Sequence, residues 1–335
     1  MKTLYLYAAR DLRLVERAQP TPRPGEALLK VTAVGLCGSD LHWYAAGQIG
    51  IWKLRAPIIL GHEFAAVVEN GPLTGKRVTV DPAIPCEACE FCERGLQYVC
   101  PQVRFAGGAD FGALSEHVCW PEHYYYPLPD ELTDADGAML EPLGVALHIL
   151  ELCHIQPGVT VGIYGCGPIG LLLVQLARMA GATRIFATDK LGHRLEAARG
   201  YGATDLLLAD NREHQAILSA TRQRGVDVAF EAAGDNAAVA AAVHTCQPCG
   251  TVVVVGIARE DEIVLPASAA RSKELTVRVA HRMNHIYPRA IALAASGKVD
   301  LRSLVSHRFP LSEYARAFDV AVNRAGLKVV IDVNA

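Results

Sequence analysis

The feature that most constrains the fold is a regular alternation of apolar and helical segments in the second half of the chain. The runs that predict strands are Val159–Tyr164, Arg184–Thr188, Asp205–Leu208, Val226–Phe230, Thr251–Val255 and Leu275–Val279. The stretches that predict helices between them are Ile169–Ala180, Gly192–Tyr201 and Asn236–Cys246. This alternation is typical of βαβ units, so it indicates an α/β fold with a doubly wound parallel sheet.

The chain before about Leu140 follows a different pattern, in which short strands alternate with glycine and proline turns. The predicted strands are Lys2–Tyr7, Ala27–Val34, Phe64–Glu69, Arg77–Val80 and Ala113–Val118. Several short strands with frequent turns favour a barrel or a sandwich.

After Arg282 the alternation stops, and we expect this tail to return to the first domain. Its predicted elements are helices at Pro288–Ser296 and Leu311–Asn323 and strands at Leu304–Phe309 and Lys328–Val333. A helix from Pro142 to about His154 connects the two patterns, because proline suits the first turn of a helix. We therefore expect one domain from residues 1–143 and 283–335 and a second from residues 144–282.

Composition excludes several classes of protein. The 335 residues are enough for about two domains, and the net charge of −3 argues against a protein that mainly grips nucleic acid. No apolar run approaches the ~18 residues of a membrane span, and the first ten residues do not resemble a signal peptide. We therefore expect a cytoplasmic protein whose ten cysteines are reduced, so that clustered cysteines indicate metal ligands.

A glycine motif marks a dinucleotide site at the start of the alternating region. Gly165, Gly167 and Gly170 form G-x-G-x-x-G between a predicted strand and a predicted helix. The glycines allow a tight turn, approach of the backbone to a pyrophosphate and close packing of helix on strand. Pro168 and Ile169 complete the loop, whose N–H groups and helix dipole attract phosphate.

Asp189 ends the next predicted strand, where a carboxylate can bind the ribose hydroxyls of NAD and repel the 2′-phosphate of NADP. Arg194 and its basic neighbours Lys190 and His193 would soften that preference. The alternative is a glycine turn that holds no ligand.

Four cysteines with the spacing C-x2-C-x2-C-x7-C predict a closed structural zinc site. They are Cys86, Cys89, Cys92 and Cys100. Four thiolates suit tetrahedral zinc and leave no position for a substrate. An iron–sulfur cluster is the alternative, because Pro101 follows the last cysteine, although ferredoxin spacing places three residues rather than seven before it.

Two further segments contain residues that can bind a catalytic metal. They are Cys37-Gly-Ser-Asp-Leu-His42 and Gly61-His62-Glu63. With the four-cysteine segment, the glycine motif and Glu141-Pro142-Leu143, they make the sequence similar to the zinc-dependent medium-chain dehydrogenase/reductase superfamily, in its polyol (sorbitol/xylitol-type) dehydrogenase branch. The resemblance covers nearly the whole chain and implies a GroES-like β-barrel catalytic domain with a Rossmann domain inserted into it.

The resemblance also implies roles for individual residues. Cys37 and His62 are implied zinc ligands, and Glu63 and Glu141 supply the remaining carboxylates, one directly and the other directly or through water. Glu141 has a second interpretation, as an acidic residue favoured at a helix N-terminus. Ser39 and His42 are implied to carry the substrate proton toward solvent.

The function implied is NAD-dependent and zinc-dependent oxidation of a secondary hydroxyl of a sugar alcohol to a ketose. Trp43 and Tyr44 follow the relay histidine and are expected to line the substrate site. Arg282, at the carboxyl end of the last predicted parallel strand, is expected to contact substrate hydroxyls, although it has alternatives as a strand cap or a ligand of a cofactor phosphate.

Two rival functions remain at this stage. L-threonine 3-dehydrogenase resembles the chain in the four-cysteine segment and in Gly61–Phe64, but Glu141-Pro142-Leu143 and Gly47-Gln-Ile-Gly50 are closer to the polyol branch. A catalytically silent dinucleotide-binding protein is the remote alternative. We expect a small-molecule substrate, two zinc ions per subunit, NAD, no nucleic acid or membrane partner, and a homotetramer or homodimer.

Overall fold

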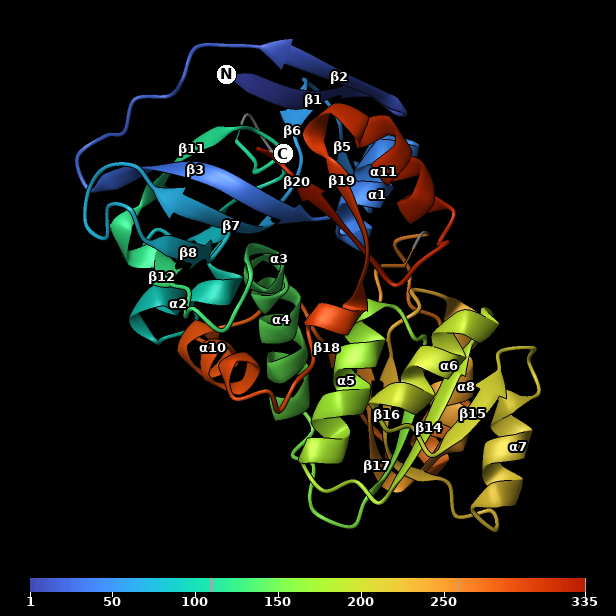
Figure 1. Ribbon diagram of the computed structural model, residues 1–335. Coiled ribbons are helices and arrows are strands. Elements are labelled where there is room, and N and C mark those ends of the chain that lie inside the picture. Colours follow the sequence, from blue (N-terminus) through green and yellow to red (C-terminus); the bar gives the residue numbers. More distant parts are fainter. Residues whose placement is uncertain (109–110, 259, 335) are drawn as a thin grey trace. The chain divides into compact units, whose positions relative to one another are not determined.

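The computed structural model describes residues 1–108, 111–258 and 260–334 and divides the chain into two compact units (Figure 1). Unit 1 comprises Met1–Gly144 and Asn284–Ala335, and unit 2 comprises Val145–Met283. Each border lies one residue after the border expected from the sequence.

Unit 1 is built around a mostly antiparallel sheet with the order β12-β8-β7-β3-β20-β19, in which β11 also pairs with β3. Its members are β3 (Glu26–Gly35), β7 (Glu63–Val68), β8 (Arg77–Val80), β11 (His117–Pro121), β12 (Tyr125–Pro127), β19 (Val305–Pro310) and β20 (Lys328–Asp332). Smaller sheets hold β1 (Lys2–Ala8), β2 (Asp11–Glu16), β4 (Gln48–Ile49), β5 (Trp52–Lys53), β6 (Ile58–Ile59), β9 (Ala83–Ile84) and β10 (Arg104–Phe105). The helices are α1 (Gly38–Ala46), α2 (Glu90–Glu93), α3 (Asp134–Ala138), α10 (Tyr287–Ala295) and α11 (Tyr314–Val322).

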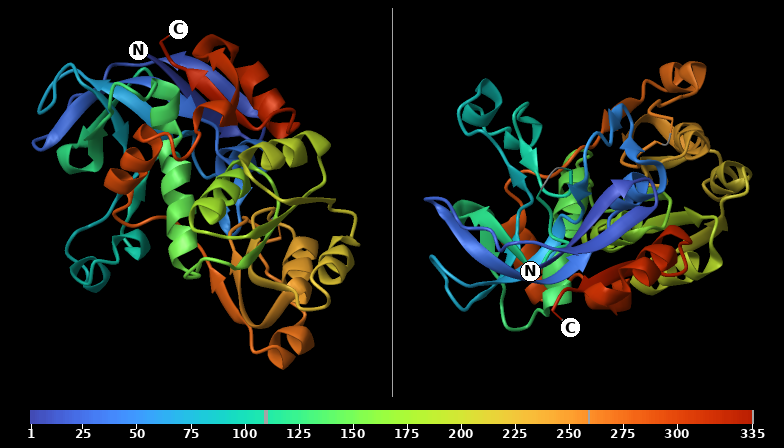
Figure 2. Two further views of the ribbon diagram at one scale, coloured as in Figure 1. Left: turned by 60° about the horizontal axis from the view of Figure 1, so that its bottom comes forward. Right: turned by 90° about the horizontal axis from the view of Figure 1, so that it is seen from above.

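Strand β3 explains how the two ends of the chain form one unit. Its residues alternate between buried and partly exposed, as expected for a strand with one face on the core. β3 pairs with β7 on one side and with β20 on the other. The blue N-terminal and red C-terminal segments accordingly lie side by side in both views of Figure 2.

Three expectations for unit 1 are wrong in detail. The strand expected at Ala113–Val118 begins only at His117, because the backbone of Ala113 and Leu114 bonds instead to Gly61, Leu60 and Leu4. The helix expected from Pro142 begins earlier, as α4 (Leu140–Glu151), so the proline is its third residue. The helix expected at Leu311–Asn323 is divided into a 3-10 turn, Leu311–Glu313, followed by α11.

Unit 2 contains a six-stranded parallel sheet with the order β15-β14-β13-β16-β17-β18, which confirms the doubly wound sheet predicted from the alternation. Its strands are β13 (Thr160–Tyr164), β14 (Arg184–Asp189), β15 (Asp205–Leu208), β16 (Val226–Glu231), β17 (Cys246–Val254) and β18 (Thr276–Val279). Its helices are α5 (Pro168–Met179), α6 (Gly192–Tyr201), α7 (Glu213–Ala220), α8 (Asn236–Thr245) and α9 (Ala267–Ser272), while α4 begins in unit 1 and ends in unit 2.

The central strands are almost continuously apolar because helices cover the sheet. Val161, Ile163, Ala229, Phe230 and Val253 are all fully buried. None of the helices in the described ranges combines the length and the apolarity needed to cross a bilayer.

Candidate metal and dinucleotide sites

One candidate metal centre lies in unit 1, where α1 and β7 begin. Cys37 is the N-cap residue of α1, His62 precedes β7, and Glu63 is its first residue. One ligand atom from each of these side chains lies within 4.8 Å of the other two. A thiolate, an imidazole and a carboxylate are three donors that zinc accepts, and three protein ligands are typical of a catalytic zinc with an open position. The donor set therefore fits zinc.

Asp40 holds two of these residues in place. Its Oδ2 accepts a hydrogen bond from the Cys37 N–H (2.9 Å), and its Oδ1 accepts one from the Gly61 N–H (3.1 Å). The same Oδ1 lies 3.6 Å from Nδ1 of His62. A carboxylate at one ring nitrogen of a metal-binding histidine orients the ring and leaves the second nitrogen for the metal. Burial opposes protonation of His62, but the negative charges of Asp40 and Cys37 outweigh burial and raise its pKa.

Lys328 is the cationic partner of Glu63. The Lys328 ammonium and the Glu63 carboxylate form an ion pair in which each side chain is 2% exposed. Lys328 is the first residue of β20, and Gly35 at the end of β3 leaves the room, because a Cβ there would overlap the Glu63 carboxylate. Burial opposes the charge on Lys328, but the negative charge of Glu63 outweighs it and raises the lysine pKa.

Glu141 lies outside the three-residue donor set, at the second position of α4. It is 7% exposed, and burial raises its pKa to about 7, with the His62 charge opposing and the Glu63 charge reinforcing the shift. Among the described residues, the donor atoms that converge are those of Cys37, His62 and Glu63. The geometry therefore favours Glu63 over Glu141 as the direct ligand.

Helix α1 also carries the two residues expected to move the substrate proton. Ser39 is half-buried in the first turn, and its hydroxyl makes no hydrogen bond with another described residue. His42 follows three residues later on the same helix and is also half-buried. Both residues therefore lie near the start of α1, close in sequence to the candidate ligand Cys37.

The two aromatic residues expected at the substrate lie in different surroundings. The Tyr44 ring packs on Phe318, with 4.9 Å between ring centroids, so it belongs to the periphery of the unit 1 core. Trp43 instead lines a surface hollow together with Lys53, Leu54 and Gly108. Trp43 packs against the same core as Tyr44, but of the two it is the one that also lines this hollow.

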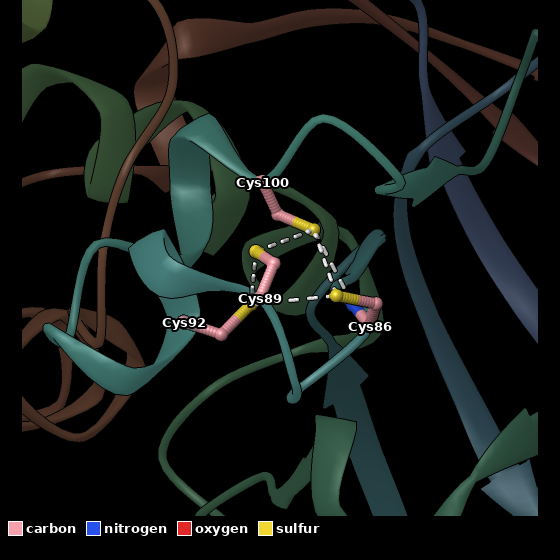
Figure 3. A group of neighbouring side chains, drawn as sticks. All are labelled: Cys86, Cys89, Cys92 and Cys100. Carbon is pink, nitrogen blue, oxygen red and sulfur yellow. Dashed lines mark hydrogen bonds between the residues drawn. The ribbon is translucent and has the colours of Figure 1, made fainter.

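The second candidate metal centre is the four-cysteine segment, shown in Figure 3. Its neighbouring sulfur atoms lie 3.5–3.9 Å apart, and all four lie within 4.8 Å of one another. Four sulfurs at ~2.3 Å from one tetrahedral zinc are separated by about 3.8 Å, whereas a cluster of several irons spreads its ligands farther. The spacing therefore favours a single zinc ion.

The electrostatics of the cysteines agree with a metal site. The backbone N–H of Ala88 lowers the pKa of the Cys86 thiol to about 7, whereas burial raises the pKa of Cys92 to about 12. A bound cation is what would keep all four side chains as thiolates at neutral pH. The segment is also tied to the tail of the chain, because the Asn284 side chain donates to the Gly95 carbonyl (2.7 Å).

The glycine loop in unit 2 has the shape that a pyrophosphate needs. Gly165 has a φ of +105°, and a Cβ on Gly170 would overlap the Gly165 carbonyl oxygen, so both positions require glycine. At Gly167 a Cβ would meet nothing closer than Nη1 of Arg194, at 3.9 Å. No protein atom therefore crowds Gly167 on the side where a Cβ would point. Helix α5 begins directly after it, with Pro168 and Ile169. The loop therefore fits a dinucleotide phosphate.

Asp189 accepts hydrogen bonds from the backbone, a role that the sequence did not predict. Its Oδ2 accepts a hydrogen bond from the Cys166 N–H inside the glycine loop (2.8 Å), and its Oδ1 accepts one from the Leu191 N–H (2.9 Å). The carboxylate thus supports the loop, in addition to the ribose contact expected from the sequence.

Arg282 lies three residues beyond the end of β18, in the segment that leaves unit 2, and is half-buried. Its place in unit 2 agrees with the carboxyl end of the last parallel strand.

Sequence reasoning missed Asp40 and Lys328. Asp40 had a local signal, because an acidic residue three positions after an N-cap completes a capping box. Lys328 had no local sequence signal, because it is the first residue of β20 and lies far along the chain from its partner Glu63.

The chain is similar to known proteins along its whole length. Residues 23–130 match the family model "Alcohol dehydrogenase GroES-like domain", and residues 168–296 match "Zinc-binding dehydrogenase". Sorbitol dehydrogenase of Bacillus subtilis (strain 168) is 34% identical over 344 residues, which cover 100% of this chain and 98% of that protein. Probable D-xylulose reductase A of Aspergillus fumigatus is 35% identical and covers 92% of this chain and 89% of its own length.

Among solved structures, a putative zinc-binding dehydrogenase from Sinorhizobium meliloti 1021, bound to NADP, superimposes with a TM-score of 0.90. It is 30% identical in sequence, and the match covers 99% of each chain.

Proposed function

The chain belongs to the zinc-binding dehydrogenase family with an alcohol dehydrogenase GroES-like domain, and from that premise we propose that it oxidises a secondary hydroxyl of a sugar alcohol to a ketose, with NAD as hydride acceptor. The family membership confirms the resemblance found in the sequence. The single observation that carries the proposal is the convergence of Cys37, His62 and Glu63 beside the buried Lys328. The relatives, a sorbitol dehydrogenase and a probable D-xylulose reductase, support a polyol and its ketose as the substrate pair.

Cys37, His62 and Glu63 would hold the catalytic zinc, with Glu141 as a nearby carboxylate outside the donor set. When bound, zinc supplies a Lewis acid that lowers the pKa of the substrate hydroxyl, and the nicotinamide supplies the hydride acceptor. Asp40 fixes the backbone at Cys37 and Gly61, so the ligands are held before the metal arrives. Cys86, Cys89, Cys92 and Cys100 would hold a second zinc with a purely structural role.

Ser39 and His42 would conduct the proton. The Ser39 hydroxyl would accept the proton from the substrate hydroxyl as it releases its own toward His42, and the His42 imidazole would pass a proton to solvent. The position of both side chains on α1, each partly exposed, supports a path to solvent.

The dinucleotide would bind at Gly165, Gly167, Pro168, Ile169 and Gly170. Asp189 would favour NAD through the ribose, and Arg194 lies beside Gly167. The NADP in the Sinorhizobium meliloti structure shows that the preference within these relatives has to be measured for each protein.

The substrate would be a small polyol, and Arg282 is the residue expected to contact its hydroxyls. The guanidinium presents a fixed fork of donors, which suits neighbouring hydroxyls better than the point charge of a lysine. A simple alcohol has no second hydroxyl for this contact, so Arg282 would select polyols.

The subunit would assemble into a homodimer or homotetramer in the cytoplasm, without a nucleic acid or membrane partner. Strand β18 supports self-assembly, because it is the edge of its sheet and Val279 is 65% exposed there. Exposed apolar edge strands tend to pair with another chain.

The formation of NADH by the purified enzyme tests the function. Sorbitol, xylitol and related polyols should give far higher kcat/KM than L-threonine or simple secondary alcohols. Turnover of threonine alone, or of no alcohol at all, would replace this proposal with one of the two rival functions.

A further inference from the structure

Glu231 is a fully buried carboxylate at the carboxyl end of β16, with 0% of the residue exposed. Its Oε1 accepts hydrogen bonds from the backbone N–H groups of Ala233 (2.8 Å), Gly234 (2.7 Å) and Asp235 (3.4 Å). Its Oε2 accepts one from the N–H of Gly256 (3.2 Å). Burial raises the pKa of Glu231, and these N–H groups oppose that shift. Both oxygens of the Glu231 carboxylate therefore accept hydrogen bonds from backbone N–H groups.

These donors belong to two different loops, which follow β16 and β17. The loops touch backbone to backbone, because a Cβ on Gly256 would overlap the nitrogen of Gly234. The glycine loop after β13 joins them, because a Cβ on Gly165 would lie only 2.8 Å from the Ala232 carbonyl carbon and the Ala233 nitrogen. Three loops thus form one contact cluster, and Glu231 binds two of them.

The sheet register explains why the three loops meet. Tyr164 pairs with Glu231, and Glu231 pairs with Val254, so the three strands end at the same level. The carboxyl ends of parallel strands are where doubly wound sheets bind their ligands.

We propose that Glu231 is a positioning residue for the dinucleotide: it holds the loops after β16 and β17 so that they support the glycine loop against the pyrophosphate. This proposal rests on dinucleotide binding in the proposed function, and it assigns Glu231 no contact with the reacting atoms.

The chemistry of the side chain explains why a glutamate stands here. A carboxylate only accepts hydrogen bonds, so both oxygens can face N–H groups, whereas an amide has to turn its NH2 toward one of them. In the variant Glu231→Gln, the amide oxygen can replace Oε1, but the NH2 group then faces the Gly256 N–H. The Gly256 N–H then keeps its bond to the Glu231 backbone carbonyl (3.1 Å) but loses its side-chain acceptor, so the loop after β17 is held less firmly while the overall shape of the side chain is kept.

Glu213 offers a matched control. It is a buried glutamate of the same unit, 6% exposed on α7, and belongs to no dinucleotide loop. Glu213→Gln removes the same charge by the same substitution. Thermal unfolding of both variants measures how much stability is lost when a buried glutamate is replaced by glutamine. The zinc content of each variant shows whether the candidate metal sites of unit 1 are intact.

The experiment compares the affinities of zinc-loaded wild type, Glu231→Gln and Glu213→Gln for NADH and for ADP-ribose by calorimetry. ADP-ribose keeps the pyrophosphate and lacks the nicotinamide. For Glu231→Gln we expect both ligands to bind about tenfold more weakly, the factor equivalent to one lost hydrogen bond to a charged group. We expect kcat at saturating NAD to stay within about twofold, since positioning acts on binding.

Unchanged affinity in Glu231→Gln would overturn the proposal. So would an equal loss of affinity in Glu213→Gln at an equal decrease in Tm, because the effect would then be general destabilisation. If Glu231→Gln does not fold, Glu231→Asp takes its place under the same criteria, since it keeps the charge but is too short to reach both loops. The proposed function fails separately, through a wild type that binds NADH yet oxidises no polyol.

Discussion

The ammonium group of Lys328 neutralises the carboxylate of Glu63 inside the protein, where water reaches only 2% of either side chain. A pair of this kind is costly to break, because removing one member leaves a buried charge without compensation. The Lys328 ammonium therefore supplies a positive charge beside the candidate metal centre before any metal binds.

The substitution Lys328→Met should destabilise the metal-free protein by about 3–5 kcal/mol, because the Glu63 carboxylate stays buried and unpaired. Urea unfolding after exhaustive chelation measures the loss. The double variant Lys328→Met/Glu63→Gln should recover most of it, because no charge remains to be neutralised. A single variant as stable as the wild type would show that the ion pair does not exist in solution.

Metal analysis should find about two zinc ions per chain, one in each donor set. Cys37→Ser should lose one zinc and the activity. Cys86→Ser should lose the other zinc and lower the thermal stability of unit 1, because the four thiolates close a loop around it. Iron and labile sulfide in the purified protein would contradict the structural zinc assignment.

Asp189→Ala should reduce the preference for NAD over NADP, mainly by weakening NAD. It should also weaken both cofactors in common, because the N–H groups of Cys166 and Leu191 lose their acceptor at a cost of about 1–3 kcal/mol. Asp189→Asn, which keeps one acceptor oxygen, should lose less. Ratios of kcat/KM with the two cofactors measure the preference, and equal wild-type values would refute the role of Asp189.

Ser39→Ala should lower kcat by about 10²–10⁴-fold with the zinc content intact, the range for loss of a general base. His42→Ala should lower kcat less, and small buffer bases should partly restore it, because His42 is accessible from solvent. Steady-state rates at several imidazole concentrations measure the rescue. If both variants keep the wild-type rate, neither residue conducts the proton.

Arg282→Ala should lower kcat/KM for polyols by about 10–100-fold, equivalent to the loss of a charged hydrogen bond of about 1.5–3 kcal/mol. Its activity on a simple secondary alcohol and its Kd for NADH should change little. A parallel loss of NADH affinity would assign Arg282 to the cofactor instead.

The local parts of the architecture could be predicted from the sequence. The strand before Gly165, the helix after Gly170 and the acidic residue at 189 are all within one βαβ unit, so their order along the chain is enough. The four cysteines are similarly close in sequence, and their spacing alone predicts that their thiols lie together.

The long-range parts could not be predicted. Lys328 contacts Glu63 only because β20 pairs with β3. No sequence pattern within β20 predicts that β3 is its neighbour. Glu231 looks like the polar end of a buried strand until the loops of Gly234 and Gly256 are seen to converge on it. The choice between Glu63 and Glu141 was open in the sequence, because it depends on which carboxylate the fold turns toward Cys37 and His62.

The position of β20 between β3 and β19 has a consequence for how the protein is made. On the ribosome, Cys37, His62 and Glu63 emerge early, but the cation that neutralises Glu63 emerges only after all of unit 2. A chain interrupted before residue 328 would hold every segment of the dinucleotide unit and yet leave a gap inside the sheet of unit 1. The candidate metal centre thereby depends on synthesis of the chain through β20, since a chain that stops before it would keep the candidate dinucleotide loop but lack the cation that neutralises Glu63.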